Sequence, residues 1–275
     1  MNYEIRKRED GKEAIFNKNG DRISQWYNWI VSEGLVKDAS KYYIAAKSFF
    51  KLAIFDVDGN QISPQWFRYI YEDGLVKGES DYYLVLGDYG FAIFDINGNM
   101  ITKDWYDWIS LEGLVKGESR YFIAKKDGKY AIFDENGNRI SEWYDEISLT
   151  GLVKGESDYY VVIEDGEWAI FDVYGNQISS KFEYIYMEGL VKGECDYYIA
   201  CDNRYNCAVY HKDGQKVSED FSVGYFEYVK KITFNENLGM VEIKTFDEKI
   251  TTIEFKPIYP YKKEEIIDYT KLLNI

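Results

Sequence analysis

The heptapeptide Gly-Leu-Val-Lys-Gly-Glu-Ser occupies residues 74–80 and returns unchanged at residues 113–119 and 151–157. Looser copies stand at 34–40 and at 189–195, where the last residue is cysteine. A second motif, Ala-Ile-Phe-Asp, starts at positions 53, 92, 131 and 169, with weaker copies at 14 and 208, so successive starts are 38 or 39 residues apart. A fixed period of this length predicts tandem repeats, each of which buries its apolar face only by stacking on its neighbours.

One repeat, residues 121–157, shows what each unit is expected to form. Aromatic and β-branched residues predict strands at 121–126 and 129–135, and the Asp-Gly pair between them predicts a two-residue hairpin turn. The second strand has apolar groups on both faces, so we expect it to be covered on both sides. A turn at Asn136-Gly137 leads into short extended pieces at 138–141 and 143–147, with 152–153 as a further candidate. The pattern predicts an antiparallel meander of about four short strands.

Two architectures fit these all-β, tandem, antiparallel units. An open β-solenoid (a superhelix) is favoured by the decayed C-terminal repeat, which has the character of a cap, whereas a five- or six-bladed β-propeller fits a period of 39 residues with about four strands per unit. We expect the solenoid. The chain then forms one repeat domain over 1–256, with five clear repeats at about 14–207 and a decayed capping repeat at 208–256. A tail at 257–275 follows, with a short helix predicted at 262–273.

The segment 127–140, followed by Tyr144-Asp145 and Gly151-Leu152-Val153, resembles the WG repeat, also called the KWG repeat. That family's consensus runs roughly Lys-Trp-Gly-Tyr-Ile-Asp-x-x-Gly, then a Tyr-Asp and a Gly-Leu. The resemblance extends over about residues 3–230, although Phe91-Ala92, Tyr130-Ala131 and Trp168-Ala169 replace the Trp-Gly pair. It implies a β-rich tandem-repeat protein of bacterial or phage origin that serves as an interaction module. It implies no common activity and no catalytic residues.

The net charge of −15 is concentrated in one part of the chain. Residues 53–207 contain 29 acidic and 13 basic side chains, a net charge of −16, and the remainder carries +1. A surface of that sign disfavours direct binding to nucleic acid or to an anionic membrane. It favours a basic protein surface as the partner, because opposite charges steer the encounter.

The cysteine content and the N-terminus indicate a cytoplasmic protein. Cys195, Cys201 and Cys207 are odd in number, so we expect no disulfide framework and a reducing compartment. Residues 1–10 are charged and have no apolar core of the kind found in secretory signals. No run of about 18 apolar residues is present to span a bilayer.

Two patterns could be mistaken for metal sites. The segments that start at Asp56 and Asp95 resemble the beginning of a calcium loop, but the required glycine and glutamate positions hold other residues, so hairpin turns are expected. Cys201, Cys207 and His211 lack the Cys-x-x-Cys spacing of structural zinc sites and an obvious fourth ligand. We therefore expect no metal and no cofactor, with Cys201 and Cys207 as small buried core residues.

Catalysis is also not expected. An active site needs unlike groups that converge, whereas the carboxylates here are one position copied along the repeats. The remaining alternative is a hydrolase with a site near the fifth repeat, where His211, the only histidine, and the three cysteines lie.

Three copied columns are candidates for a binding surface. The lysine column is expected either to form an inter-repeat ion-pair ladder with the glutamate column or to contribute to a striped docking face. An aromatic column that also accepts Glu146 should be partly exposed, and exposed aromatic residues beside acidic groups are typical interface anchors. The glutamate column is Glu79, Glu118, Glu156 and Glu194; the lysine column is Lys77, Lys116, Lys154 and Lys192; the aromatic column is Trp29, Tyr69, Trp108 and Tyr184.

These features together predict a non-catalytic, acidic protein–protein interaction module. Its glutamate and aromatic columns would bind a basic partner surface. A sharper form of this hypothesis is an inhibitor that masks the nucleic-acid groove of an enzyme such as a nuclease, as immunity proteins and anti-CRISPR proteins do. The alternative is a general WG-repeat adaptor or scaffold.

Overall fold

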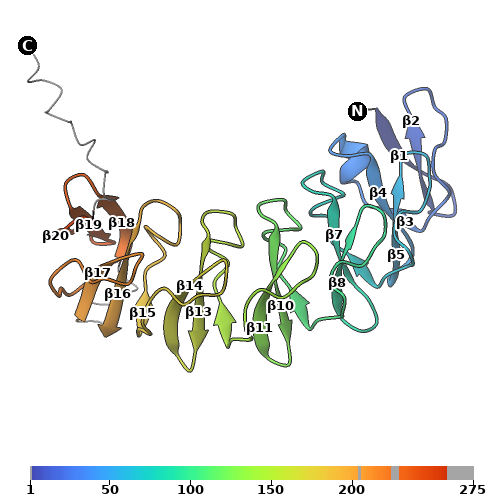
Figure 1. The fold of residues 1–275 in the computed structure, drawn as a ribbon. Helices are drawn as coiled ribbons and strands as arrows, with labels where there is room; N and C mark the ends of the chain where they lie inside the picture. Colours follow the sequence, from blue (N-terminus) through green and yellow to red (C-terminus); the bar gives the residue numbers. More distant parts are fainter. Residues whose placement is uncertain (1, 204–205, 224–228, 259–275) are drawn as a thin grey trace, which may run out of the picture. The chain divides into compact units, whose positions relative to one another are not determined.

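The structure, a computed structural model, describes residues 2–203, 206–223 and 229–258 and consists mainly of antiparallel strands and turns (Figure 1). It divides into two compact units. Unit 1 comprises Met1–Lys181 with Val191–Gly193, and unit 2 comprises Phe182–Leu190 with Glu194–Ile275. The boundary between the units passes through the heptapeptide copy at 189–195.

Unit 1 has long two-stranded hairpins, most of them preceded by a strand of only two residues. A short 3₁₀ helix, η1 (Gly34–Lys37), lies in the first heptapeptide copy. The strands of unit 1 are β1 (Tyr3–Lys7), β2 (Glu13–Asn17), β3 (Trp29–Ile30), β4 (Tyr42–Ser48), β5 (Lys51–Asp56), β6 (Tyr69–Ile70), β7 (Tyr82–Leu86), β8 (Phe91–Asp95), β9 (Trp108–Ile109), β10 (Tyr121–Lys126), β11 (Lys129–Asp134), β12 (Glu146–Ile147), β13 (Tyr159–Glu164) and β14 (Glu167–Asp172).

The predicted hairpin at 121–135 is confirmed. β10 pairs antiparallel with β11, and the turn between them places both Asp127 and Gly128 at positive φ, 52° and 83°. β9 completes the sheet in the order β11-β10-β9, and the sheets β3-β4-β5, β6-β7-β8 and β12-β13-β14 are built in the same way. The predicted repeat of short antiparallel strands is therefore correct.

The extended piece predicted at 143–147 serves two successive sheets. Tyr144 forms a bridge with Tyr130 of β11, while Glu146, two residues later, already pairs with Ile163 of β13 in the next sheet. The piece predicted at 138–141 is reduced to a single bridge between Arg139 and Phe133. Residues 152–153 form a turn rather than a strand. Each connection therefore leaves one sheet and enters the next.

The sheets of unit 1 stack face to face. The strand predicted to be covered on both sides, now β11, has Phe133 in one apolar cluster and Ile132 in another, so this prediction is confirmed. Phe122 of β10 packs in one apolar cluster with Leu84 of the preceding sheet. Its neighbour Ile123 points to the other face and packs in a cluster with Val162 of the following sheet. Because successive side chains point to opposite faces of a strand, apolar residues are needed at consecutive positions.

Unit 2 continues the strand pattern. Its sheets have the orders β15-β16-β17 and β18-β19-β20, so the strands expected within 231–256 are present. The helix predicted at 262–273 lies outside the described residues. Among the residues that are described, no helix is long and apolar enough to cross a membrane. The strands of unit 2 are β15 (Tyr184–Ile185), β16 (Tyr197–Asn203), β17 (Asn206–His211), β18 (Val229–Asn235), β19 (Met240–Thr245) and β20 (Ile250–Glu254).

A disulfide in unit 2 corrects one expectation. Cys201 of β16 and Cys207 of β17 are directly opposite one another in the register and form a disulfide bond. Both are fully buried, as expected for small core residues, but they are not free thiols. An odd number of cysteines does not exclude a single disulfide. Two of the three are bonded here, and Cys195 remains a free thiol.

Candidate partner-binding surface

Each full heptapeptide folds into the same tight loop between a two-residue strand and a long strand. In the copy at 113–119, the backbone N–H of Glu118 donates to the carbonyl of Gly113 at 2.9 Å. The Glu118 side chain closes the loop from the other direction, because its Oε2 accepts from the backbone N–H of Gly113, also at 2.9 Å. The glutamate column therefore has a structural role inside its own loop.

Consecutive loops in unit 1 are joined by a hydrogen-bond ladder. The hydroxyl of Ser119 donates to the carbonyl of Val153 in the next copy at 2.5 Å. The same bond joins Ser80 to Val115 at 2.6 Å. The remaining rungs are Ser40 to Val76 at 2.7 Å and Ser157 to Val191 at 2.6 Å.

Backbone contact explains the glycine in the middle of the motif. A Cβ atom on Gly117 would lie 2.3 Å from the carbonyl oxygen of Glu79 in the preceding copy. The first copy has no predecessor in the chain, and there Asp38 stands at the same position with a similar φ of 59°. The repetition of the motif therefore has a packing cause, which sequence reasoning missed. The departure at Asp38-Ala39 was the signal that could have revealed it.

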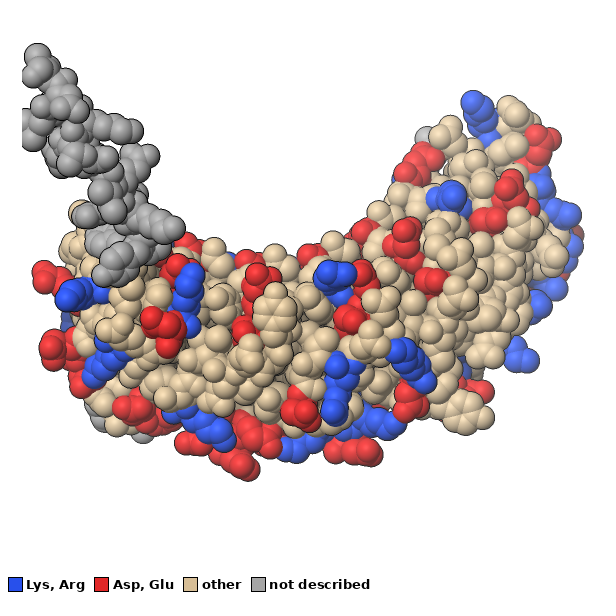
Figure 2. Space-filling model, in the orientation of Figure 1, with Lys and Arg blue, Asp and Glu red and all other residues tan. Residues whose placement is uncertain are grey.

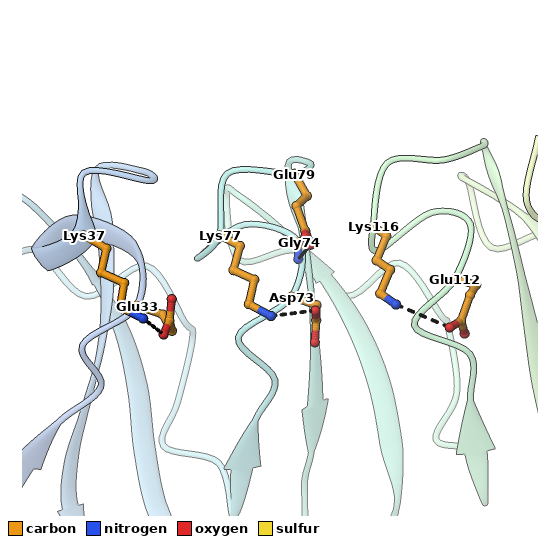
Figure 3. Close-up of polar contacts among 8 residues, drawn as sticks. All are labelled: Glu33, Lys37, Asp73, Gly74, Lys77, Glu79, Glu112 and Lys116. Carbon is orange, nitrogen blue, oxygen red and sulfur yellow. Dashed lines mark hydrogen bonds and ion pairs between the residues drawn. The ribbon is translucent and has the colours of Figure 1, made fainter.

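The glutamate column nevertheless remains at the surface. Glu79, Glu118, Glu156 and Glu194 are all exposed residues. The bond from the loop glycine to Oε2 is 2.8–2.9 Å in all four copies that contain the glutamate, and it holds each carboxylate in one orientation. Figure 3 shows Glu79 and Gly74 of the second copy. Glu79, Glu118 and Glu156 belong to unit 1, and Glu194 belongs to unit 2. The first three form a row of similarly oriented carboxylates along the stacked loops.

Lysines of the lysine column form ion pairs within their own repeats. The expected ion-pair ladder between repeats is therefore wrong for these lysines. The ammonium group of Lys77 lies 2.9 Å from Asp73, and that of Lys116 lies 3.3 Å from Glu112, in each case four residues earlier (Figure 3). The hydrogen bond to Asp73 raises the pKa of Lys77. Lys154, which has Thr150 at the corresponding position, is an exposed residue. The two paired lysines therefore neutralise Asp73 and Glu112 rather than the carboxylates of the glutamate column.

The aromatic column forms the first position of the short strands. Tyr69 is 47% exposed and Trp108 is 38% exposed, while Trp29 and Tyr184 are half-buried. Each ring also packs within its own repeat: the Trp29 and Phe49 ring centroids are 5.3 Å apart. The Trp108 and Tyr130 ring centroids are 6.1 Å apart. The column thus combines rim packing with partial exposure.

The structure does not bring the aromatic and glutamate columns together. Trp108 pairs with Lys125, next to the hairpin turn, whereas Glu118 lies before the opposite end of the same long strand. At 3.3 Å per residue, the four residues of strand from Lys125 back to Tyr121 correspond to about 13 Å, and Glu118 lies three residues before Tyr121. Unit 1 therefore carries two rows, an acidic row on its heptapeptide loops and an aromatic row near its hairpin turns.

Sequence reasoning also missed the residues that hold the hairpin turns. The carboxylate of Asp107 accepts from the backbone N–H of Asp127 at 2.9 Å, and Asp145 does the same for Asp165 in the next sheet. The β4–β5 turn differs, because Phe49 and Phe50 stand there and are 81% and 67% exposed. The Tyr-Asp pair of the motif was the signal for these caps.

Acidic side chains occupy much of the loop edge of unit 1. On the face shown in Figure 2, red carboxylate groups gather along the edge where the heptapeptide loops lie. Lysine and arginine are mixed with them on this edge and along the opposite edge, which carries the hairpin turns. The row of glutamates lies in an environment that favours cationic ligands.

The aspartates of the tight turns bind their own loops. Oδ1 of Asp95 accepts from the backbone N–H groups of Asn97 and Asn99, and Oδ2 accepts from the Asn99 amide at 2.9 Å. Burial acts to raise the pKa of Asp95, but these bonds outweigh it and leave the pKa lowered. The expectation of hairpin turns at these segments is confirmed. No metal-binding cluster of histidine, cysteine or carboxylate occurs in the described parts of the chain.

The reactive residues near the fifth repeat do not form a nucleophilic pair. Cys201 and Cys207 are bonded to one another, so neither offers a thiolate. Burial raises the pKa of the remaining thiol, Cys195, to about 12, which keeps it protonated at neutral pH. His211 is buried, with its Nδ1 3.0 Å from Oδ1 of Asp213.

No family model matches the chain, and no curated protein matches it. Similar solved structures include BamB from Moraxella catarrhalis, at 13% identity over 94% of this chain and 81% of that chain, with a TM-score of 0.32. The β-propeller domain of Cps50 (Swd1) from Myceliophteria thermophila matches at 14% identity over 92% and 93% of the two chains, with a TM-score of 0.31. The designed protein Ika8 matches at 10% identity over 93% and 81%, with a TM-score of 0.35. Similarity at this level does not decide how the repeats are arranged.

Proposed function

We propose that this protein is a non-catalytic interaction module whose acidic row binds a basic protein surface. The observation that carries the proposal is the set of exposed glutamates that their own loops hold in one orientation. Ordering side chains is a cost of association, so carboxylates that are already fixed bind a cationic partner at lower cost. The aromatic row, with Tyr69 and Trp108 partly exposed, is a second contact surface for the same partner or for another one.

The sharper form of the proposal is an inhibitor that covers the nucleic-acid groove of an enzyme. Such a groove is lined with cations that bind phosphates, and a row of fixed carboxylates can occupy it. Immunity proteins and anti-CRISPR proteins act in this way. We also propose that the chain is a WG-repeat protein from a bacterium or a phage. The alternative is a general WG-repeat adaptor. We also propose a cytoplasmic location, although the Cys201–Cys207 bond removes the part of that reasoning that rested on free cysteines.

The experiment is capture of the partner from the native host, followed by measurement of association. Recovery of a nuclease or another nucleic-acid enzyme supports the inhibitor, and recovery of a neutral structural protein excludes it. The quadruple variant Glu79→Gln, Glu118→Gln, Glu156→Gln and Glu194→Gln then removes four charges but keeps an oxygen that can accept the loop hydrogen bond.

We expect this variant to slow association at least tenfold at low salt while its melting temperature falls by only a few degrees. Rising salt should abolish the difference, because exposed charges are screened beyond roughly 8–10 Å near physiological ionic strength. An unchanged association rate would mean that the glutamates serve the loops alone.

For the arrangement of the repeats, we propose an open stack rather than a closed propeller. Support comes from strand pairing, because β1 pairs with β2 and β20 pairs with β19, each in a sheet made of consecutive strands. Closure of a propeller commonly combines the first and last strands of a chain in one blade.

A further inference from the structure

Two shallow grooves open between consecutive heptapeptide loops of unit 1. One lies between the first and second copies and has a volume of about 320 Å³, and the other lies between the third and fourth copies, at about 370 Å³. Their linings share four equivalent positions: Ser40, Tyr42, Gly78 and Asp81 in the first are equivalent to Ser119, Tyr121, Gly155 and Asp158 in the second. The grooves are therefore a product of the repeat. The glutamates are not equivalent, because Glu79 comes from the later copy of its pair and Glu118 from the earlier copy.

Each groove has one tyrosine in its wall, Tyr42 (only 6% exposed) or the half-buried Tyr121, together with two carboxylates. Glu79 and Asp81 line the first groove, and Glu118 and Asp158 line the second. The chain already places a cation against this wall, because the ammonium group of Lys41 lies 5.5 Å from the centroid of the Tyr42 ring. A cation over a tyrosine ring is attracted by the negative face of that ring. The same surroundings suit a cationic side chain from another molecule.

Each groove is also lined by one basic side chain of this protein, which offsets part of the negative charge of its carboxylates. In the first groove this cation is Lys41, already described. In the second it is Arg120, whose guanidinium lies 2.6 Å from Oε1 of Glu135, a residue that does not line the groove. Two carboxylates against one cation leave each groove with an acidic excess.

The stacking of the sheets sets the distance between grooves. Sheets packed face to face are about 10 Å apart, so the two grooves, two junctions apart, are separated by about 20 Å. A polyproline II chain rises about 3.1 Å per residue and completes a turn in three residues. Side chains at every third residue therefore point to the same side about 9.3 Å apart, and every sixth residue matches the spacing of the two grooves.

We propose that the grooves bind an extended segment of the partner with lysine or arginine at every third residue, so that two basic side chains six residues apart enter the two grooves. This inference rests on the proposed function and specifies it: the partner contributes an extended basic segment rather than a folded basic surface.

Two synthetic peptides of identical composition test the spacing. One is (Lys-Pro-Pro)₄, and the other has four consecutive lysines followed by eight prolines. Calorimetric titration of the full chain should show at least tenfold tighter binding of the spaced peptide. The double variant Asp81→Asn and Asp158→Asn should weaken the spaced peptide at least fivefold and the blocked peptide less than twofold.

The matched control is the double variant Asp127→Asn and Glu142→Gln, which removes the same charge from exposed residues of unit 1 outside the grooves. It should change neither affinity more than twofold, and circular dichroism checks that both variants stay folded. Equal binding of the two peptides, lost for both at high salt, would contradict binding in the grooves. It would still support an acidic module that binds basic partners. If neither peptide binds, the groove proposal fails, and the association of the captured partner with the quadruple glutamate variant tests the acidic module separately.

Discussion

At the scale of single residues, one aromatic position recurs in the hairpins β4–β5, β7–β8, β10–β11, β13–β14 and β16–β17. The ring at this position stacks on a ring of the partner strand, as Tyr83 does on Phe94 at 5.8 Å and Phe122 does on Phe133 at 5.4 Å. The hydroxyl of Tyr83 is buried and, within the described residues, has no hydrogen-bond partner. Burial accordingly raises the pKa of Tyr83. The fold uses the ring, and the hydroxyl adds nothing that the structure reveals.

Tyr83→Phe is therefore expected to leave the free energy of unfolding unchanged or to raise it by up to about 1 kcal/mol, because it removes a buried polar group that lacks a partner. The reverse change, Phe122→Tyr, should lower it by about 1–3 kcal/mol. Urea unfolding monitored by circular dichroism measures both. A loss of more than 1 kcal/mol in Tyr83→Phe would mean that the hydroxyl has a bonded partner.

At the scale of elements, the sequence predicted the hairpins well because their determinants are local. Asp127-Gly128 and the alternation in 121–135 are contained in one short segment, and the observed strands end within one residue of the predicted limits. The contacts that the heptapeptide makes with neighbouring copies could not be predicted in the same way. Its serine and its central glycine act on neighbouring copies 34–39 residues away, so their contacts depend on how the sheets stack. Exposure of the glutamates was expected, but their bonds to the loop glycines were not.

Stacking of the loops leads to a prediction at this scale. Gly117→Ala should lower the free energy of unfolding by about 3 kcal/mol, because its Cβ would lie 2.3 Å from the carbonyl of Glu79 and its φ is +69°. Gly128 is the matched control, since its φ is +83° but nothing lies within 4 Å of the added Cβ. Gly128→Ala should therefore lower the free energy of unfolding by only about 1–2 kcal/mol, which is the cost of holding alanine at a positive φ. Equal losses in the two variants would show that contact between loops contributes nothing.

At the scale of the whole molecule, the sequence located the acidic excess but not its division into rows. Glu118 and Trp108 are ten residues apart and lie toward opposite ends of β10. A count of charges along the chain cannot detect this separation, because it depends on strand direction. The acidic row and the aromatic row are therefore separate surfaces, on different edges of unit 1.

The arrangement of the repeats gives the last prediction. Spin labels at Glu4→Cys and Thr252→Cys, both exposed positions, report the separation of the first and last sheets when Cys195 is replaced by serine. If the seven sheets of the described residues formed an open stack at about 10 Å per sheet, the labels would lie roughly 60 Å from one another. Closure into a propeller would put β1 beside the last strands, at about 5 Å per strand. Pulsed electron resonance distinguishes the two, and singly labelled samples exclude contacts between molecules. A main distance below about 25 Å would replace the open stack with a closed ring, because only closure brings the first and last strands into one blade.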